Sequence, residues 1–271
     1  MISVEFDYQR AESVADAVNL LSDGGDSVVL AGGHSLVPML KLRVASPSRL
    51  VDISGIAELV GIRDAGDHLA IGAMTTHRGV ADSPTIQSGC PVLAETAAGI
   101  GDLQVRNRGT IGGSIAQADS HGDLPTLLLA LGGSVAVQGP SGSRTIDAGD
   151  LFTGYLTTSL QPGELITEVR APKVSSAAYV KFTRRQADWA IVGVAAVIDG
   201  SSLRVAINGM GLTPVRASAA EQAWSGGNAA EAAARAADGL RPIGDEAGSA
   251  EYRSHLATVL TRRAIEAATA R

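Results

Sequence analysis

The sequence contains a single cysteine, Cys90, among 271 residues. One thiol excludes a disulfide framework, and it excludes a self-contained Cys-ligated iron–sulfur cluster, which needs about four thiolates. Any such cluster that works with this chain must therefore lie on another polypeptide. A low cysteine count is also compatible with a reducing compartment.

The chain also lacks long apolar runs and a basic surplus. No window approaches the ~18 uninterrupted apolar residues of a membrane-spanning helix. The N-terminal segment MISVEFDYQR has no apolar core of the kind found in signal peptides. The net charge is −6, and no Lys/Arg cluster suggests a nucleic-acid binder. We expect a soluble cytoplasmic protein.

Hydrophobic residues make up 45% of the chain, so a core can form without covalent links. Apolar periodicity predicts a helix over residues 13–22 capped by Ser13, and the Val-rich run 27–31 predicts a buried strand. From about residue 57 the pattern predicts pairs of strands. Pro91 is expected to begin a helix, and residues 123–131 are predicted to form a buried helix.

Beyond a boundary near residue 175, three strand-like runs precede an Ala-rich helical segment. Strands followed by helices indicate an α+β unit. We therefore predict two domains, residues 1–175 with subdomains of about 1–56 and 57–175, and residues 176–271.

Two segments with paired glycines carry the chemical signal. Gly32-Gly33 follows the predicted strand, and Gly112-Gly113 follows a threonine. Paired glycines let backbone N–H groups converge on an anion, so two such loops could clamp a pyrophosphate. Neither is a Rossmann or P-loop fingerprint, and each alone is compatible with an ordinary tight turn.

Asp119 and Asp123 follow the second glycine pair. An acidic side chain there could accept hydrogen bonds from a ribose. Asp123 could equally cap the predicted helix that it opens, and both roles could hold together.

The segments Ala31–Leu36, with Pro38–Arg43 behind it, and Gln104–Ser114 resemble the two FAD motifs of carbon monoxide dehydrogenase medium subunits. Three further segments are similar to landmarks of the same family: Ile71–Thr76, Gly163–Thr167 and Glu251–Arg253. The resemblance runs from about Phe6 to about Ala264.

The resemblance implies a two-subdomain FAD-binding domain of the PCMH type, followed by a three-stranded antiparallel sheet and a helical bundle. It implies a molybdenum hydroxylase in which this chain is the FAD-carrying, electron-transferring subunit. Molybdopterin would lie on a large subunit and two [2Fe–2S] clusters on a small one, in a dimer of heterotrimers. Such a subunit has no catalytic residue for the primary substrate and no metal ligand.

The resemblance also carries over contacts with FAD. Asp123 would bind on the ribose side, Ile100 and Ile166 would make apolar contacts, and Lys181 would contact the flavin. Trp189 occupies the position where related subunits carry a tyrosine over the isoalloxazine, and an indole can stack there equally well. The two loops would hold the pyrophosphate through Leu30, Ala31, Gly32, Gly33, His34, Ser35, Leu36, Thr110, Ile111, Gly112, Gly113 and Ser114.

Each of these positions has an ordinary structural alternative. Ile100 and Ile166 could be plain core, Lys181 a strand residue whose amine reaches solvent, and Trp189 a packing residue. His34 contributes chiefly its backbone, since no other His or Cys lies at ligand spacing.

The stretch Ala118–Asp123 departs from the family pattern. Many relatives have proline at the position of Ser120, and here a histidine, His121, follows. Asp123 keeps its spacing, so FAD binding should survive. His121 is expected to be an exposed loop residue without a role.

Two other functions remain open from the sequence. One is a stand-alone NAD(P)H-dependent flavin reductase of the same superfamily, and the other is a non-redox FAD-binding assembly module. Relatives act on carbon monoxide, purines, N-heterocycles and aldehydes. We expect a different chain of the whole enzyme to determine which of these substrates it oxidises. The electron acceptor and the oligomeric state of the isolated chain are not specified by these motifs.

Overall fold

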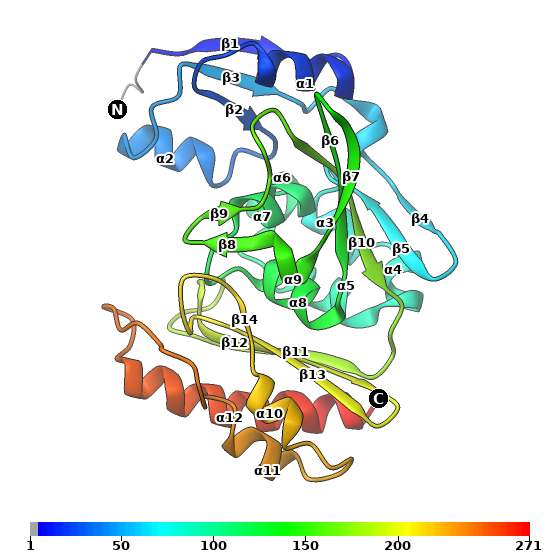
Figure 1. The fold of residues 1–271 in the computed structure, drawn as a ribbon, viewed down its shortest axis with the longest axis vertical. Coiled ribbons are helices and arrows are strands. Elements are labelled where there is room, and N and C mark those ends of the chain that lie inside the picture. Colours follow the sequence, from blue (N-terminus) through cyan, green and yellow to red (C-terminus); the bar gives the residue numbers. More distant parts are fainter. Residues whose placement is uncertain (1–4) are drawn as a thin grey trace.

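The structure is a computed structural model that describes residues 5–271. Its secondary structure is stacked in three parts along the long axis, in chain order from the N-terminus to the C-terminal helices (Figure 1). Within the described residues, no helix combines the length and the apolar character needed to cross a membrane.

The N-terminal part is a small parallel sheet with two helices. Ser13 caps the first helix by accepting a hydrogen bond from the Asp16 N–H, as its sequence predicts. Ala17 and Val18 of that helix pack against the sheet and against Leu165 from the middle part. The elements are β1 (Asp7–Arg10), β3 (Arg49–Asp52) and β2 (Ser27–Leu30) in spatial order, with α1 (Val14–Ser22) and α2 (Leu36–Leu42).

The middle part contains a five-stranded antiparallel sheet. Strand β6 alternates buried and half-buried residues, with Val135 and Val137 facing the core, as expected for a half-buried strand. The spatial order is β4 (Ile62–Asp64), β5 (His68–Gly72), β10 (Leu165–Pro172), β6 (Ser134–Gly139) and β7 (Gly142–Asp147). The short pair β8 (Phe152–Gly154) and β9 (Thr157–Thr158) and the 3-10 helix η1 (Ala57–Leu59) complete it.

Seven helices accompany this sheet in the described chain. Pro91 opens one of them, as predicted, since its missing N–H is not needed in a first turn. Every residue of α8 is buried, because α8 also contacts strands of the C-terminal sheet. The helices are α3 (His77–Ala81), α4 (Pro84–Gly89), α5 (Pro91–Ala98), α6 (Leu103–Arg108), α7 (Ile111–Gln117), α8 (Asp123–Leu131) and α9 (Ala148–Leu151).

The C-terminal part is an antiparallel sheet covered on both faces. In its central strand β12, Ala195 and Val197 join the core cluster of α8, whereas Val194 and Ala196 join the cluster of α12. Apolar residues on both faces explain why this strand reads as a continuous hydrophobic run. The elements are β11 (Ala177–Thr183), β12 (Ala190–Asp199), β13 (Ser202–Asn208), β14 (Val215–Arg216), α10 (Ser218–Gln222), α11 (Ala229–Ala234) and α12 (Ala250–Thr269).

The predicted α+β class is confirmed, and so is the expected order, in which a sheet-and-helix unit ends the chain. The three expected C-terminal strands are present, and the two-residue β14 extends the sheet. The description of Thr110–Ser114 as a loop is wrong, because Gly112 and Gly113 lie in the first turn of α7.

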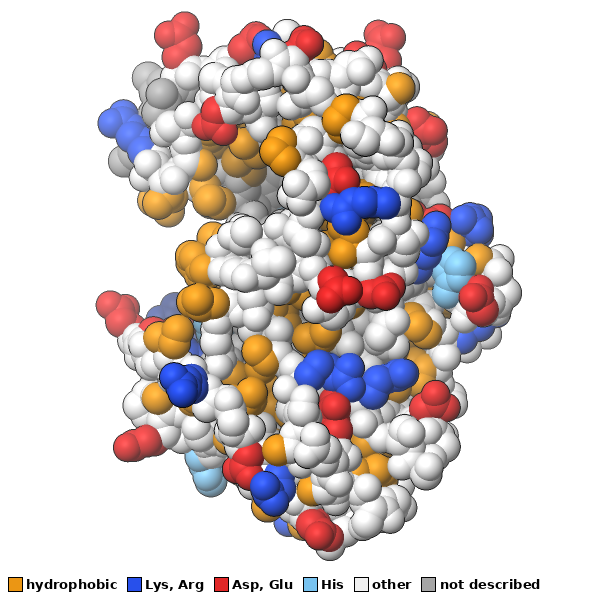
Figure 2. Space-filling model, viewed as in Figure 1, with side chains coloured by type: hydrophobic (Ala, Val, Ile, Leu, Met, Phe, Trp, Pro, Cys, Tyr) orange, Lys and Arg blue, Asp and Glu red, His pale blue; other side chains and the backbone are white. Residues whose placement is uncertain are grey.

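The surface view shows acidic and basic side chains interspersed, without an extended basic patch (Figure 2). Hydrophobic side chains gather on the α2 side of a hollow near the upper third of the molecule. Val37, Leu42 and Val44 are the exposed large apolar residues on and just after α2.

Candidate functional site

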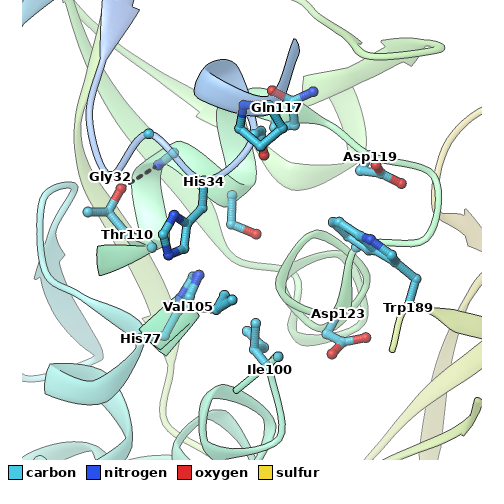
Figure 3. A pocket seen from close by; sticks show the side chains of 18 of the residues that line it. Gly32, His34, His77, Ile100, Val105, Thr110, Gln117, Asp119, Asp123 and Trp189 are labelled. Carbon is cyan, nitrogen blue, oxygen red and sulfur yellow. Dashed lines mark hydrogen bonds between the residues drawn. The ribbon is translucent and has the colours of Figure 1, made fainter. Parts of the chain in front are cut away.

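One cleft of about 500 Å³ draws its lining from all three parts of the chain (Figure 3). This volume lies within the ~300–1,000 Å³ usual for small-molecule and cofactor sites. The lining residues are Val29, Ala31, Gly32, Gly33, His34, Ser35, Leu36, Pro38, His77, Ile100, Gly101, Asp102, Gln104, Val105, Gly109, Thr110, Gly113, Ser114, Gln117, Asp119, Gly122, Asp123, Lys181, Ala187, Asp188 and Trp189.

The first glycine segment lines this cleft and contains unpaired backbone donors. Within residues 5–271, the N–H groups of residues 32–36 have no hydrogen-bond acceptor. Ser35 precedes α2 without a side-chain cap, and Gly33 has φ +77°, a conformation that favours glycine. A run of unpaired amides at a turn leading into a helix makes a concave anion-binding site.

This segment lies directly against the chain that joins α6 to α7. A Cβ on Gly32 would sit 2.2 Å from the Arg108 carbonyl oxygen, so only glycine permits the approach. The His34 ring nitrogen Nε2 lies 3.2 Å from the Gln104 carbonyl oxygen. The two glycine segments therefore form one continuous wall of the cleft.

The second glycine segment differs from the first, because its amides are already bonded. Thr110 caps α7 by accepting from Gly113 N–H, and the N–H of Gly112 donates to Ala73. A Cβ on Gly112 would lie 2.5 Å from the Ala73 Cβ, so this glycine serves helix packing. What the segment offers the cleft is the small Gly113 surface and the Ser114 hydroxyl.

A carboxylate at the start of α8 is held by residues from the C-terminal sheet. Lys181 Nζ lies 2.6 Å from Asp123 Oδ2, and the Tyr179 hydroxyl donates to Asp123 Oδ1 at 2.6 Å. Asn208 donates in turn to the Tyr179 oxygen at 2.9 Å. Gly122, not Asp123, is the N-cap of α8, so the capping role considered for Asp123 is not the one adopted.

This network affects Tyr179 strongly. Removal of the hydroxyl from water, together with the adjacent Asp123 carboxylate, raises the pKa of Tyr179 well above 10. The phenol is therefore a permanent donor, and each oxygen of Asp123, which lines the cleft, keeps acceptor capacity beyond these bonds.

Lys181 is oriented by a second acceptor. Its Nζ donates to the Gly99 carbonyl at 3.1 Å, so two of its three N–H groups are used within the protein. The adjoining Ile100–Gly101 turn is held by Arg106, whose Nη1 donates to both carbonyls at 2.9 and 2.8 Å.

Trp189 lies at the edge of the cleft and is 60% exposed. It comes two residues after Ala187, which has φ +65°, and directly before Ala190, the first residue of β12. Trp189 is therefore not a core residue, and its indole is available to a ligand. Figure 3 shows it across the cleft from the glycine segments.

His77 is a lining residue that the sequence did not single out. It is 5% exposed, and burial first, then the charges of His34 and Arg106, lower its pKa from 6.5 to about 4. Its Nδ1 has no hydrogen-bond partner among the described residues. A neutral imidazole thus packs against Gly109, where a Cβ would lie 2.8 Å from the ring.

The structure gathers most of the predicted site residues around the cleft and leaves four outside its lining. Ile111 and Ile166 are buried, Gly112 packs on Ala73, and Leu30 ends β2. Those that line the cleft are Ala31, Gly32, Gly33, His34, Ser35, Leu36, Ile100, Thr110, Gly113, Ser114, Asp123, Lys181 and Trp189.

His121 differs from its expectation. It is half-buried, not exposed, and its Nδ1 lies 2.8 Å from the Ala190 carbonyl oxygen. Sequence alone gave no sign of this contact, because the two residues are 69 positions apart.

The described residues contain no group of three or more His, Cys, Asp or Glu side chains arranged to hold a metal ion. Cys90 is a buried free thiol, and burial raises its pKa to about 11, so it is not poised as a nucleophile.

Two family models match the chain. The model described as the FAD binding domain in molybdopterin dehydrogenase matches residues 4–174. The model described as the CO dehydrogenase flavoprotein C-terminal domain matches residues 177–268.

Curated relatives match over nearly their full lengths. The carbon monoxide dehydrogenase medium chain of Hydrogenophaga pseudoflava is 40% identical, over 100% of this chain and 99% of the relative. The 6-hydroxypseudooxynicotine dehydrogenase complex subunit alpha of Paenarthrobacter nicotinovorans is 41% identical, over 96% and 93%.

Solved structures agree. A chain of carbon monoxide dehydrogenase from Hydrogenophaga pseudoflava superposes with a TM-score of 0.95 at 41% identity, covering 100% of this chain and 99% of that one. A chain of quinoline 2-oxidoreductase from Pseudomonas putida 86 superposes with a TM-score of 0.94 at 33% identity, with the same coverage.

Proposed function

Since this chain belongs to the family of FAD-binding medium subunits of molybdopterin dehydrogenases, we propose that its cleft holds FAD and relays electrons from an iron–sulfur partner to an external acceptor. The relatives are subunits of larger oxidoreductases, which favours this function over a stand-alone NAD(P)H-dependent reductase or a non-redox FAD module.

The residues of the cleft fit FAD, chiefly because one wall of the cleft carries unpaired backbone donors. Residues 32–36 line the cleft, their N–H groups are unpaired within the described chain, and a diphosphate bound there would supply the missing acceptors. The close approach of Gly32 to Arg108 keeps this wall free of side-chain bulk.

We assign the residues of the cleft as follows. The diphosphate lies against Ala31–Leu36 and the Thr110–Ser114 segment, in which Ser114 adds a hydroxyl. Asp123 accepts from the ribose side through lone pairs that Tyr179 and Lys181 leave free. Leu30, Ile111, Gly112 and Ile166 act from behind, by packing the elements that carry these groups.

The remaining groups set the properties of the ring. Bound FAD supplies the redox chemistry. Lys181 lines the cleft with one N–H unused by the protein, and its positive charge favours negative charge there, while Ile100 and Trp189 give apolar and stacking surfaces. No residue of this chain acts as acid, base or nucleophile toward the primary substrate.

The assembly follows from the family. We propose a heterotrimer with a molybdopterin large subunit and a [2Fe–2S] small subunit, paired into a dimer of heterotrimers, in the cytoplasm. The names of relatives specify different substrates, among them nicotine, glyceraldehyde and caffeine. We therefore place substrate choice outside this chain. We also propose domains 1–175 and 176–271, with subdomains of about 1–56 and 57–175.

The test is electron entry into the flavin. The chain is loaded with FAD, and its absorbance is followed after mixing with NADPH, and separately with the small subunit whose clusters have been reduced. We expect bleaching of the flavin by the reduced clusters and none by NADPH. Bleaching by NADPH alone, or by neither reductant, would overturn the proposal.

A further inference from the structure

His121 connects two walls of the cleft that are distant in sequence. One wall is the segment 119–123 before and at the start of α8, and the other is the turn 187–189 before β12. The His121 Nδ1 lies 2.8 Å from the carbonyl oxygen of Ala190. A carbonyl oxygen only accepts, so Nδ1 carries the hydrogen and donates it.

The base of this link is fixed. The backbone N–H of His121 donates to Asp119 Oδ1 at 2.8 Å, and the N–H of Gly209 donates to the Ser120 carbonyl at 2.9 Å. The imidazole therefore projects from a segment that is already tied both to itself and to the C-terminal sheet.

The other end of the link is the entrance of β12. The next carbonyl, that of Ile191, accepts from Arg253 Nη1 at 2.5 Å, and Arg253 is 1% exposed. Successive carbonyls of a strand point in opposite directions. His121 and Arg253 thus hold residues 190 and 191 from opposite sides.

Trp189 stands directly before these two anchored residues. Among residues 5–271, its own backbone N–H donates only to Asp188 Oδ1, at 3.1 Å, and Ala187, two positions earlier, has φ +65°. The exposed indole has little packing of its own, so its direction depends on how the entrance of β12 is held.

We propose that His121 is a positioning residue that fixes Trp189 at the cleft by donating a hydrogen bond to Ala190. The inference rests on the proposed function, since Trp189 is expected to cover the bound flavin.

The experiment first follows the indole without FAD. A Trp224→Phe background leaves Trp189 as the single tryptophan. His121→Ala removes the donor, and His121→Asn restores an amide N–H near the position of Nδ1. We expect higher acrylamide quenching and lower fluorescence anisotropy of Trp189 in the Ala variant, and values like those of the parent in the Asn variant.

The second readout is FAD affinity in the same proteins. We expect about two- to tenfold weaker binding in the Ala variant, the change that one lost hydrogen bond produces, and recovery in the Asn variant. Should the Ala variant fail to fold, His121→Gln, whose amide lies one carbon farther out, takes its place with the same expectation.

The outcomes separate the two proposals. Identical Trp189 signals in all variants, or equal changes in the Ala and Asn variants, would overturn the positioning role. Absence of FAD binding in the parent would overturn the proposed function, whereas the apo-protein fluorescence would still report on the link.

Discussion

The Cα of Gly32 lies so close to the Arg108 carbonyl that a Cβ would come within 2.2 Å of its oxygen. This contact joins the turn after β2 to the connection before α7, two segments 76 residues apart along the chain (108 − 32). Backbone packs directly on backbone at this wall of the cleft. The amides of residues 32–36, which line the cleft beside this contact, have no acceptor in the described chain.

Gly32→Ala should damage both the fold and the cofactor site. Forcing a methyl against backbone costs about 1–3 kcal/mol of unfolding free energy. Separating the two segments should weaken FAD binding at least about tenfold, equivalent to ~1.4 kcal/mol. Urea unfolding and titration of flavin fluorescence measure the two effects. Gly149→Ala is the matched control, because a Cβ there meets nothing within 4 Å. Parent-like FAD affinity in Gly32→Ala would contradict the geometry.

Tyr179→Phe should destabilise the protein. The change removes one donor from the Asp123 carboxylate and leaves a buried charge less well satisfied. The expected loss is about 1–3 kcal/mol of unfolding free energy. Denaturant midpoints measure it, with Tyr155→Phe as the control, since Tyr155 is 62% exposed. Equal denaturant midpoints for the two variants would show that the Tyr179–Asp123 hydrogen bond does not contribute to the free energy of unfolding.

His77 should make the apo-protein less stable in mild acid. Its folded pKa is about 4 against 6.5 when unfolded, so the unfolded chain takes up the proton first. Stability is unaffected above pH 6.5, falls as pH drops toward 4, and loses up to ~3 kcal/mol from this group.

His77→Gln should flatten that fall in stability between pH 6.5 and 4. His255→Gln, on the exposed face of α12, should leave it unchanged. Unfolding measured in urea across this pH range compares the three proteins. An identical pH dependence in the parent and in His77→Gln would contradict the buried neutral imidazole.

Lys181→Met should lower the midpoint potential of the bound flavin. We expect the ammonium to stabilise the reduced, negatively charged cofactor, and a charge-assisted hydrogen bond of about 1.5–3 kcal/mol corresponds to ~30–60 mV for two electrons. Redox titration against a dye measures the shift. Lys173→Met removes a lysine paired with Asp64 outside the cleft and should not move the potential. The same potential in all three proteins would remove Lys181 from the tuning role.

Local rules predicted much of the fold from the sequence. Ser13 caps α1, Pro91 opens α5, and the apolar run at 123–131 forms a helix that is buried throughout. Each of these signals is contained within one element, where capping and periodicity act directly.

The parts that sequence reasoning missed depend on distant contacts. Gly112 and Gly113 read as a second phosphate loop, yet they lie in the first turn of α7, where Gly112 donates to the Ala73 carbonyl and packs against that residue. The burial of His77 and the reach of His121 to Ala190 are likewise set by elements far along the chain. The resemblance indicated most of the residues that line the cleft. It did not indicate that the amides of the first glycine segment are unpaired whereas those of the second are already bonded, because that difference is visible only in the hydrogen bonds of the structure.

The most direct test of the central claim is the absorption spectrum of this chain purified by its own tag after co-expression with its genomic neighbours. The account predicts flavin bands together with iron–sulfur absorption and co-purifying molybdenum, since flavin and clusters are divided between chains. A preparation without flavin, and with none taken up after FAD is added, would contradict it.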